Sequence, residues 1–355
     1  MKKGTREKIR KLSPALQKKI VFDEIFYETG RGQTPVSDEL VRTKLHCNAG
    51  RTVEAGLQLR KHCDGGGKIF LTMAGAGSSF QMGITISQMI RAGKIAAISV
   101  TGANLEESLY RLVANDEYAH IPRYEELTPS EEKALDHAGL RRITDTFLPE
   151  EESVRKILPI FEKLWRKAQK EKRRYLWHEF FFQFFQHNDA PKLGIQGRVE
   201  NCWLYQAWLY KIPIFVPGWE DSTLGNVFAA ECLEKRFGPS LIKSGIEYMM
   251  ALAAWYQTTS KAHDLGFFQI GGGIAGDFPI CVVPLLEQDA KQRDVKKWQY
   301  FCQVTDAEES YGGYSGALPT EKRSWGKLPA DCPAFNIKSD ASIVVPLIFA
   351  RVLGW

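Results

Sequence analysis

The sequence has 355 residues, and its 44% apolar and 25% charged residues are typical of a folded globular protein, not of a disordered, collagenous or fibrous one. It holds no run of 18 apolar residues and no apolar segment near its start, so it predicts neither a transmembrane helix nor a secretory signal. The length is ample for a full hydrophobic core, and one large α/β domain accommodates it.

The formal net charge of +5 is concentrated at the N-terminus. Residues 1–19 hold eight basic residues and one acidic residue, which leaves 39 basic and 41 acidic residues in the rest of the chain. We therefore predict a basic N-terminal arm over residues 1–35, either solvated and partly helical or a docking element, and a single domain over residues 36–355. Because the excess charge belongs to the arm and not to a face of the domain, neither nucleic acid nor a membrane is an expected partner.

The first half of the chain shows alternating helices and strands. Val36, Leu40, Val41 and Leu45 have helical spacing, which predicts a helix over 36–63 with Ser37 as its N-cap. A glycine turn at 65–67 then leads to a short apolar run. The further predicted elements are a buried strand at 69–73, a glycine-rich loop and a helix to about 92, a second buried strand at 95–100 and a helix at 105–113. This order is that of a parallel α/β sheet.

The middle of the chain is rich in helix signals. Thr128 and Pro129 form a typical helix start, and Pro149, followed by three glutamates, predicts the start of another helix. The aromatic run Phe180–Phe185, between His178 and His187, predicts a helix buried in the core or at a subunit contact, in preference to an aromatic binding site.

Strands return in the second half. The apolar runs at 212–216, 267–270 and 300–304 predict three more strands, with a helix from about Leu224 and a long polar loop from 305 through 328. A helix or mixed segment at 342–352 ends the chain. No internal repeat or linker is present. The fold class that we predict is α/β, a doubly wound and mostly parallel sheet with extra helices.

The seven cysteines and seven histidines show no metal-site spacing. An odd number of cysteines without a CxxC pair predicts reduced thiols and a cytoplasmic protein. We predict no bound metal.

Four predicted strand ends carry small or polar residues, at 75–81, 101–107, 217–221 and 271–273. In an open parallel sheet ligands bind at these ends, and glycines there let backbone N–H groups approach a phosphate closely. Tight turns need glycine too, but several such loops together favour a nucleotide. The first loop departs from the dinucleotide fingerprint because Phe80 stands where the third glycine belongs, which disfavours a conventional dehydrogenase.

The segment 305–327 combines acids, glycines, Trp325 and Lys327. Long loops inside a compact domain are often functional. A lysine beside an indole in a desolvated site can act as an amine nucleophile, although composition alone favours an ordinary surface lysine.

This segment resembles the acidic, glycine-rich loop of the deoxyhypusine synthase family. Residues 309–319 lead without a gap to Glu321 and to Ser-Trp-Gly-Lys at 324–327, a motif specific for that family. The resemblance covers about residues 69–345. The further blocks that match in order are Ile69–Leu71, Val100–Glu107, Ile212–Asp221 with Leu224 and Gly225, Gly271–Gly273 and Ser339–Ser342.

The resemblance implies a Rossmann-like NAD-binding fold, a homotetramer with active sites between paired subunits, and a redox-neutral transfer. In the family NAD oxidises spermidine, a lysine captures the aminobutyl group as an imine, an acceptor amine displaces the lysine, and NADH reduces the product. Lys327 would be that lysine, Trp325 would pack on the alkyl chain and Glu321 would hold an ammonium. Family members often cover the active-site entrance with an N-terminal arm, a role open to the basic arm here.

By the same resemblance, Asn226, Tyr314 and Asp277 would complete the substrate site. The residues that would bind NAD are Gly77, Thr101, Gly102, Ala103, Glu106, Asp221, Gly272, Gly273, Glu308, Asp340 and Ala341.

The departures from the family pattern concentrate in the amine site. Asn226 replaces an aspartate, Tyr311 and Tyr314 replace two more, and Asp277 or Phe278 stands at the family's histidine. In the first loop, serines of the family become Gly77 and Gln81. A tri-cationic polyamine needs several carboxylates in a partly desolvated site, and at least two are missing here.

We therefore expect an NAD-dependent alkylamine transferase that takes a small-molecule amine other than the usual one. Homospermidine-type transfer to a free diamine, a donor less cationic than spermidine, and a catalytically degenerate NAD-binding protein remain alternatives.

Overall fold

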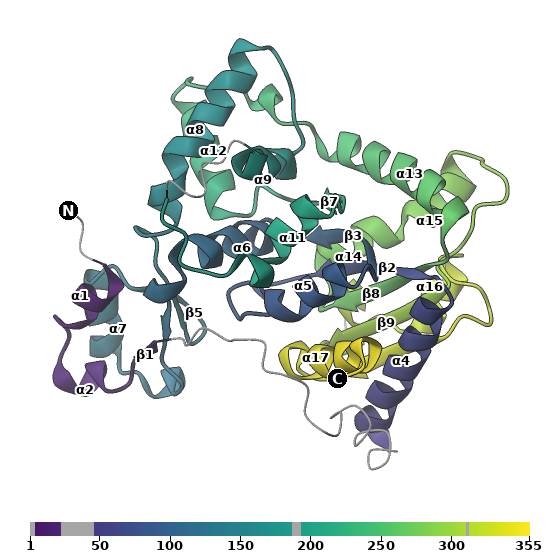
Figure 1. Ribbon diagram of the computed structural model, residues 1–355, viewed down its shortest axis with the longest axis horizontal. Helices are drawn as coiled ribbons and strands as arrows, with labels where there is room; N and C mark the ends of the chain where they lie inside the picture. Colours follow the sequence, from purple (N-terminus) through teal and green to yellow (C-terminus); the bar gives the residue numbers. More distant parts are fainter. Residues whose placement is uncertain (1–3, 23–45, 187–192, 310–311) are drawn as a thin grey trace.

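The six parallel strands of the main sheet position everything else in this computed structural model, which describes residues 4–22, 46–186, 193–309 and 312–355. The sheet order is β10-β9-β8-β2-β3-β7, and every neighbouring pair is parallel (Figure 1). The strands are β2 (Lys68–Met73), β3 (Ile95–Val100), β7 (Ile214–Phe215), β8 (Leu265–Ile270), β9 (Tyr300–Thr305) and β10 (Ala334–Lys338).

The chain winds outward from the middle of this sheet in two directions. It runs β2, β3, β7 to one edge and then β8, β9, β10 to the other, which is the 3-2-1-4-5-6 order of the Rossmann fold. The direction reverses between β2 and β8, and dinucleotides bind outside the strand ends at such a reversal. The predicted doubly wound α/β fold is confirmed.

Helices cover both faces of the sheet. Phe268 and Gln269 are neighbours on β8 and therefore point to opposite faces. The ring of Phe268 lies 4.8 Å from that of Phe349 on α17, whereas Gln269 packs against Gly276 of α14. The covering helices include α4 (Cys47–Asp64), α5 (Gly83–Arg91), α6 (Gly102–Ala114), α11 (Trp203–Leu209), α13 (Gly245–Ala262), α14 (Gly273–Ile280), α15 (Val282–Pro284) and α17 (Ala341–Leu353).

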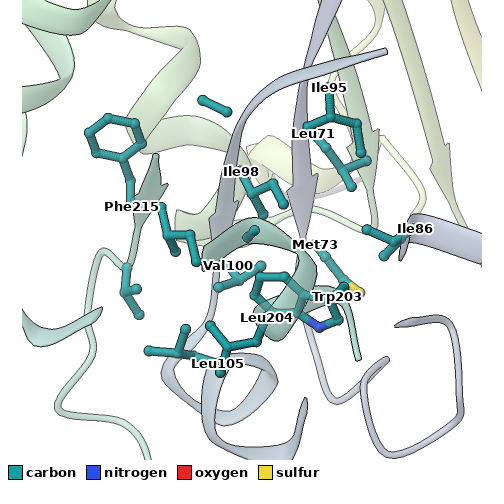
Figure 2. Packing of buried hydrophobic residues seen from close by; sticks show 14 of the residues in the cluster. Leu71, Met73, Ile86, Ile95, Ile98, Val100, Leu105, Trp203, Leu204 and Phe215 are labelled. Atoms are coloured by element: carbon teal, nitrogen blue, oxygen red, sulfur yellow. The ribbon is translucent and has the colours of Figure 1, made fainter. Parts of the chain in front are cut away.

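The apolar core reaches up to the strand ends. Met73 and Val100, the last residues of β2 and β3, are fully buried in one cluster with Trp203 of α11 (Figure 2). The indole N–H of Trp203 donates to the Ser78 hydroxyl at 2.9 Å. Core packing therefore anchors the loop that follows β2.

A group of aromatic helices stands beside the sheet: α8 (Val154–Lys170), α9 (Trp177–Gln186) and α12 (Thr223–Leu233) (Figure 1). Phe180, Phe181, Phe184 and Phe185 are buried, which confirms the predicted core packing of this run. The predicted start of α8 at Pro149 is wrong, because the three glutamates lie in the preceding turn and the helix begins at Val154.

The N-terminal segment 4–22 packs on a separate small sheet with the order β1-β4-β6-β5 (Figure 1). Ile9, Leu12 and Leu16 share an apolar cluster with residues of this small sheet and of α7. Lys8 pairs with Glu152 at 3.3 Å, and Lys19 with Glu131 at 3.0 Å. The described part of the basic arm is thus docked on acidic residues of its own chain. The elements are α1 (Thr5–Ile9), α2 (Pro14–Gln17), β1 (Val21–Phe22), β4 (Ala119–His120), α7 (Pro129–His137), β5 (Arg141–Ile143) and β6 (Thr146–Leu148).

Most of the predicted strands are confirmed, but the end of the chain differs from expectation. The segment predicted as a polar loop contains α16 (Pro319–Ser324), and β10, which follows it, was not predicted. The predicted Ser37 N-cap and residues 36–45 of the first helix lie outside the described residues, as does Tyr311. Among the described residues no helix combines the length and apolarity that crossing a membrane requires.

Candidate active site

Lys327 is held by the end of a short helix. Helix α16 begins with Pro319 and ends in two backbone bonds, from the Gly326 N–H to the Arg323 carbonyl at 2.9 Å and from the Lys327 N–H to the Lys322 carbonyl at 3.0 Å. This pair of bonds is the Schellman motif, whose turning residue adopts a left-handed conformation. Gly326 has φ +71°, which explains a glycine between Trp325 and Lys327.

The Lys327 side chain is buried, with 9% of its surface exposed, and its Nζ lies 3.6 Å from Asp277 Oδ1 on α14. The same carboxylate oxygen accepts from the Cys281 thiol at 3.5 Å. The Tyr314 ring centroid lies 5.6 Å from Lys327 Nζ. The structure therefore brings together three of the predicted site residues, Lys327, Asp277 and Tyr314, around one amine.

A second lysine, which the sequence analysis missed, belongs to this group. Lys322 is 2% exposed, donates from Nζ to the Ala317 carbonyl at 2.6 Å, and lies 4.7 Å from the Tyr314 ring centroid. Burial lowers the pKa of Lys322 to about 8, with the Lys327 charge acting in the same direction and Glu321 opposing it. Lys322 and Lys327 are the two positions of a Schellman motif that usually form an apolar contact, and here both are lysines.

Tyr314 is locked in the position of a family carboxylate. Its hydroxyl donates to Gln269 Oε1 at 2.8 Å. Burial, with the nearby Asp277 charge, raises the pKa of Tyr314 well above its usual value, so it is neutral. Gln269 in turn packs against Gly276, where a Cβ would lie 2.7 Å from the side-chain amide carbon.

Three predicted substrate residues are exposed. Trp325 is 59% exposed, and Glu321 lies beside it on the same helix. Asn226 lies on the exposed surface of α12, and in the described part of the chain its side chain makes no hydrogen bond with the Lys327 group.

On the other side of the reversal point, Asn104 organises the loop after β2. It is fully buried, and its side-chain amide donates to the carbonyls of Ala74 at 3.0 Å and Gly75 at 2.8 Å while accepting from the Ser78 N–H at 2.9 Å. Thr101 caps α6 and donates its hydroxyl to the Gly75 carbonyl at 2.9 Å. Asn104 was not among the predicted site residues, although it directly follows Thr-Gly-Ala at the start of α6.

The predicted cofactor residues near α12 are placed by close packing. A Cβ on Gly102 would lie 2.8 Å from the Trp219 carbonyl, so only glycine admits the loop that carries the exposed Asp221. Glu106 is buried and accepts from the N–H groups of Thr223 and Leu224 at 2.8 and 2.9 Å. Both oxygens of Glu106 cap α12, and its burial raises its pKa; its cofactor role stays a prediction.

The loop after β8 is joined to the lysine segment. The Gly273 N–H donates to the Ser315 hydroxyl at 3.0 Å. A Cβ on Gly272 would overlap the Ser315 side chain and lie 2.7 Å from its Cα. The segment that carries Tyr314 is thus seated directly on the start of α14.

The remaining predicted cofactor residues lie at the ends of β9 and β10. Glu308 pairs with Lys338 at 2.6 Å, and both are accessible. Asp340 is the N-cap of α17, accepting from the Ser342 N–H at 2.7 Å, and Ala341 is the first residue of that helix. The last two lie elsewhere: Gly77 is in the loop after β2, buried against Met73, and Ala103 is in the first turn of α6.

The strand ends fit a dinucleotide. Gly75 and Gly273 follow β2 and β8, the two strands on either side of the reversal point, and both have positive φ. No atom lies within 4 Å of a Cβ built on either residue, so open space adjoins both backbones. Exposed glycine backbone at this place is what a pyrophosphate requires. A separate hollow, in which no predicted site residue takes part, is lined by Ser78, Gln81, Arg111, Arg198 and Trp203 among others.

Comparisons with known proteins agree with this arrangement. The family model for deoxyhypusine synthase matches residues 42–352. A deoxyhypusine synthase-like protein of a Cyanothece species is 27% identical over 290 residues, covering 80% of this chain and 70% of its own length. The deoxyhypusine synthase of Nicotiana tabacum is 24% identical over 296 residues, covering 81% and 71%.

The fold also has a counterpart among solved structures. The crystal structure of a protein assigned as a deoxyhypusine synthase from Entamoeba histolytica superposes with a TM-score of 0.54 at 11% identity. The match covers 89% of this chain and 93% of that one, so it shows a shared fold.

Proposed function

The chain belongs to the deoxyhypusine synthase family, and we propose that it is an NAD-dependent alkylamine transferase acting through an imine on Lys327. The observation that carries the proposal is the Lys327 amine itself. It is buried at a glycine-dependent helix end, 3.6 Å from Asp277, in a segment joined by Ser315 to a glycine-rich strand end. The segment that carries the amine is therefore joined by a hydrogen bond to the loop after β8, where a dinucleotide would bind.

NAD would be held by the backbones at Gly75 and Gly273, by Thr101 and Asp221, and by Asp340 at the start of α17. When bound, it supplies reversible hydride transfer, taking a hydride from the carbon that bears the donor amine and later returning it. The rest of the reaction falls to side chains of this chain.

Lys327 Nζ adds to the oxidised carbon of the donor and forms a new C–N bond. The bond from that carbon to the donor's own nitrogen breaks, and this nitrogen leaves as a free amine with the proton that Nζ gives up. An acceptor amine then adds to the same carbon and releases Lys327, so atoms and charge balance. Asp277 Oδ1 is placed to hold the proton that Nζ gives up and takes back. The burial of the Lys327 side chain, which is 9% exposed, limits the access of water that would hydrolyse the imine.

The exposed side chains around this site support an assembly. Trp325, Ile274 and Ile246 are all more than half exposed although they are large and apolar. Such residues on a soluble protein mark interaction surfaces. We propose a homotetramer in which a second subunit covers Trp325, and we place it in the cytoplasm, because all seven cysteines are free.

The substrate departs from the family's usual one. Tyr314 is neutral and tied to Gln269, and Asn226 is an amide, so two positions that would hold ammonium groups carry no charge. Each lost charge-assisted hydrogen bond removes roughly 1.5–3 kcal/mol. We expect poor use of spermidine with a protein acceptor, and better use of a less cationic donor or of a free diamine as acceptor.

These losses also support a second candidate, a family member that binds NAD without turnover. A screen of amines for NADH formation with the purified protein separates the two candidates. We expect NAD binding by calorimetry and NADH absorbance with at least one amine. Lys327→Arg should lose transfer but keep NAD affinity, and the exposed Lys261→Arg is its matched control. NAD binding without any amine-dependent signal favours the degenerate protein.

A further inference from the structure

Two lysine ammonium groups lie beside the ring of Tyr314, which stands where the family resemblance calls for a carboxylate. Lys322 and Lys327 lie 4.7 and 5.6 Å from the same Tyr314 ring centroid, so their Nζ atoms are no more than about 10 Å apart. The carboxylates that face them are Asp277 on α14, paired with Lys327, and the exposed Glu321 on α16. Tyr314 and the Cys281 thiol, the other titratable groups here, contribute no negative charge at neutral pH.

Lys322 is fixed in this position. The residue is 2% exposed. Its ammonium donates to the Ala317 carbonyl at 2.6 Å and lies over the rings of Phe301 and Tyr314 at 5.5 and 4.7 Å. A carbonyl and two aromatic faces stabilise a cation. In the described part of the chain no carboxylate forms an ion pair with Lys322, although the charges of Glu321 and Asp277 act on it from a longer distance. Its ammonium therefore stands as a positive charge beside Lys327.

We propose that Lys322 is a specificity-determining residue that restricts the group carried on Lys327 to one whose far end is neutral or anionic. This inference rests on the proposed function. Both Nζ atoms lie over the Tyr314 ring, so a four-carbon chain that leaves Lys327 along this ring would bring its far end close to Lys322. A second ammonium there is repelled, whereas a carboxylate is attracted.

The size of the effect follows from Coulomb's law. Two like charges about 10 Å apart, in surroundings with an effective dielectric constant near 20, repel each other. The free energy of this repulsion corresponds to roughly tenfold weaker binding. A shorter separation increases it.

The test uses aldehydes, which form an imine with a lysine amine and release water without needing NAD. The three probes are butanal, 4-oxobutanoate and 4-(trimethylammonio)butanal, which have the same chain length and neutral, negative and positive ends. Cyanoborohydride reduces the imine to a stable secondary amine. Intact mass gives the rate of labelling, and peptide mapping gives the labelled residue.

For the wild-type protein at pH 7 we expect labelling at Lys327, with the cationic aldehyde about tenfold slower than butanal and 4-oxobutanoate at least as fast. Lys322→Met, which keeps the length of the side chain and removes its charge, should abolish this order. Lys322→Arg, the matched control, should keep it. Wild-type rates that are equal, or fastest with the cationic aldehyde, overturn the proposal even if Lys322→Met fails to fold.

A pH series gives an independent readout. Burial lowers the pKa of Lys322 to about 8, so the wild-type ratio between the aldehydes should shrink between pH 7 and pH 9.5. Taking the ratio at each pH cancels the titration of Lys327 itself. A ratio that is constant across this range contradicts the proposal.

The labelling results distinguish the proposed role of Lys322 from the proposed imine chemistry of Lys327. Labelling of Lys327 with an order that Lys322→Met leaves unchanged refutes the role of Lys322 and leaves the transferase proposal intact. Absence of any Lys327 adduct with all three aldehydes refutes the lysine chemistry, and the specificity proposal with it.

Discussion

The candidate site has two halves that are built in opposite ways, the loops after β2 and β3 and the segments after β8 and β9. After β2 and β3, the buried side chain of Asn104 and the half-buried side chain of Thr101 both donate hydrogen bonds to the Gly75 carbonyl. After β8 and β9, two buried cations lie against aromatic rings, and Trp325 is exposed. The first half is a prearranged backbone surface, typical of a site that recognises a fixed ligand. The second half lacks carboxylates that the family pattern has, so we expect this chain to differ from its relatives in the amine substrate that it takes.

Replacing Asn104 should have the largest effect on the first half, because its side chain holds the loop after β2. Asn104→Ala leaves the buried Ser78 N–H and the Ala74 carbonyl without their side-chain partner, while the Gly75 carbonyl keeps its bond from Thr101. We expect a loss of about 3 kcal/mol in the free energy of unfolding and weakened NAD binding. Denaturant unfolding and calorimetry measure both. The exposed Asn226→Ala is the matched control and should change stability by less than about 0.5 kcal/mol.

The joint within the second half, between the loop after β8 and the segment that carries Tyr314, should be the next most sensitive place. In Gly272→Ala the new methyl group overlaps Ser315, and relief requires movement of the segment that carries Tyr314. We expect a destabilisation of about 1–3 kcal/mol and slower labelling of Lys327 by aldehydes. Gly313→Ala, with ordinary φ and open space, should do neither. Wild-type labelling in Gly272→Ala would show that the two segments are independent.

The smallest expected effect concerns Asp340, which has both a structural and a predicted cofactor role. Asp340→Ala removes the cap of α17, at a cost of about 1 kcal/mol, and should weaken NAD binding. Asp340→Asn keeps the cap but not the charge. If NAD affinity recovers fully in Asp340→Asn, the carboxylate acts only through the helix start.

The sequence was sufficient for five strands of the main sheet because they are short apolar runs, and for Lys327 because of the motif around it. The strand β10 was missed because its sequence, Ala-Phe-Asn-Ile-Lys, is interrupted by polar residues. The element α16 was missed although Pro319 and Gly326 are a helix start and stop, since six residues are too few to show periodicity. Lys322 was missed for the same reason, because only the closed helix end brings it to Lys327. Asn104 and the docking of residues 4–22 depend on contacts between distant parts of the chain, which spacing does not encode.

The central claim is that Lys327 carries the transferred group, and borohydride trapping tests it most directly. The protein is incubated with NAD and the amine that gives NADH in the screen, reduced, digested and mapped by mass spectrometry. The account predicts one adduct, on Lys327, that requires NAD and is absent from Lys327→Arg. An adduct on Lys322 or any other residue, or full turnover by Lys327→Arg, would contradict it.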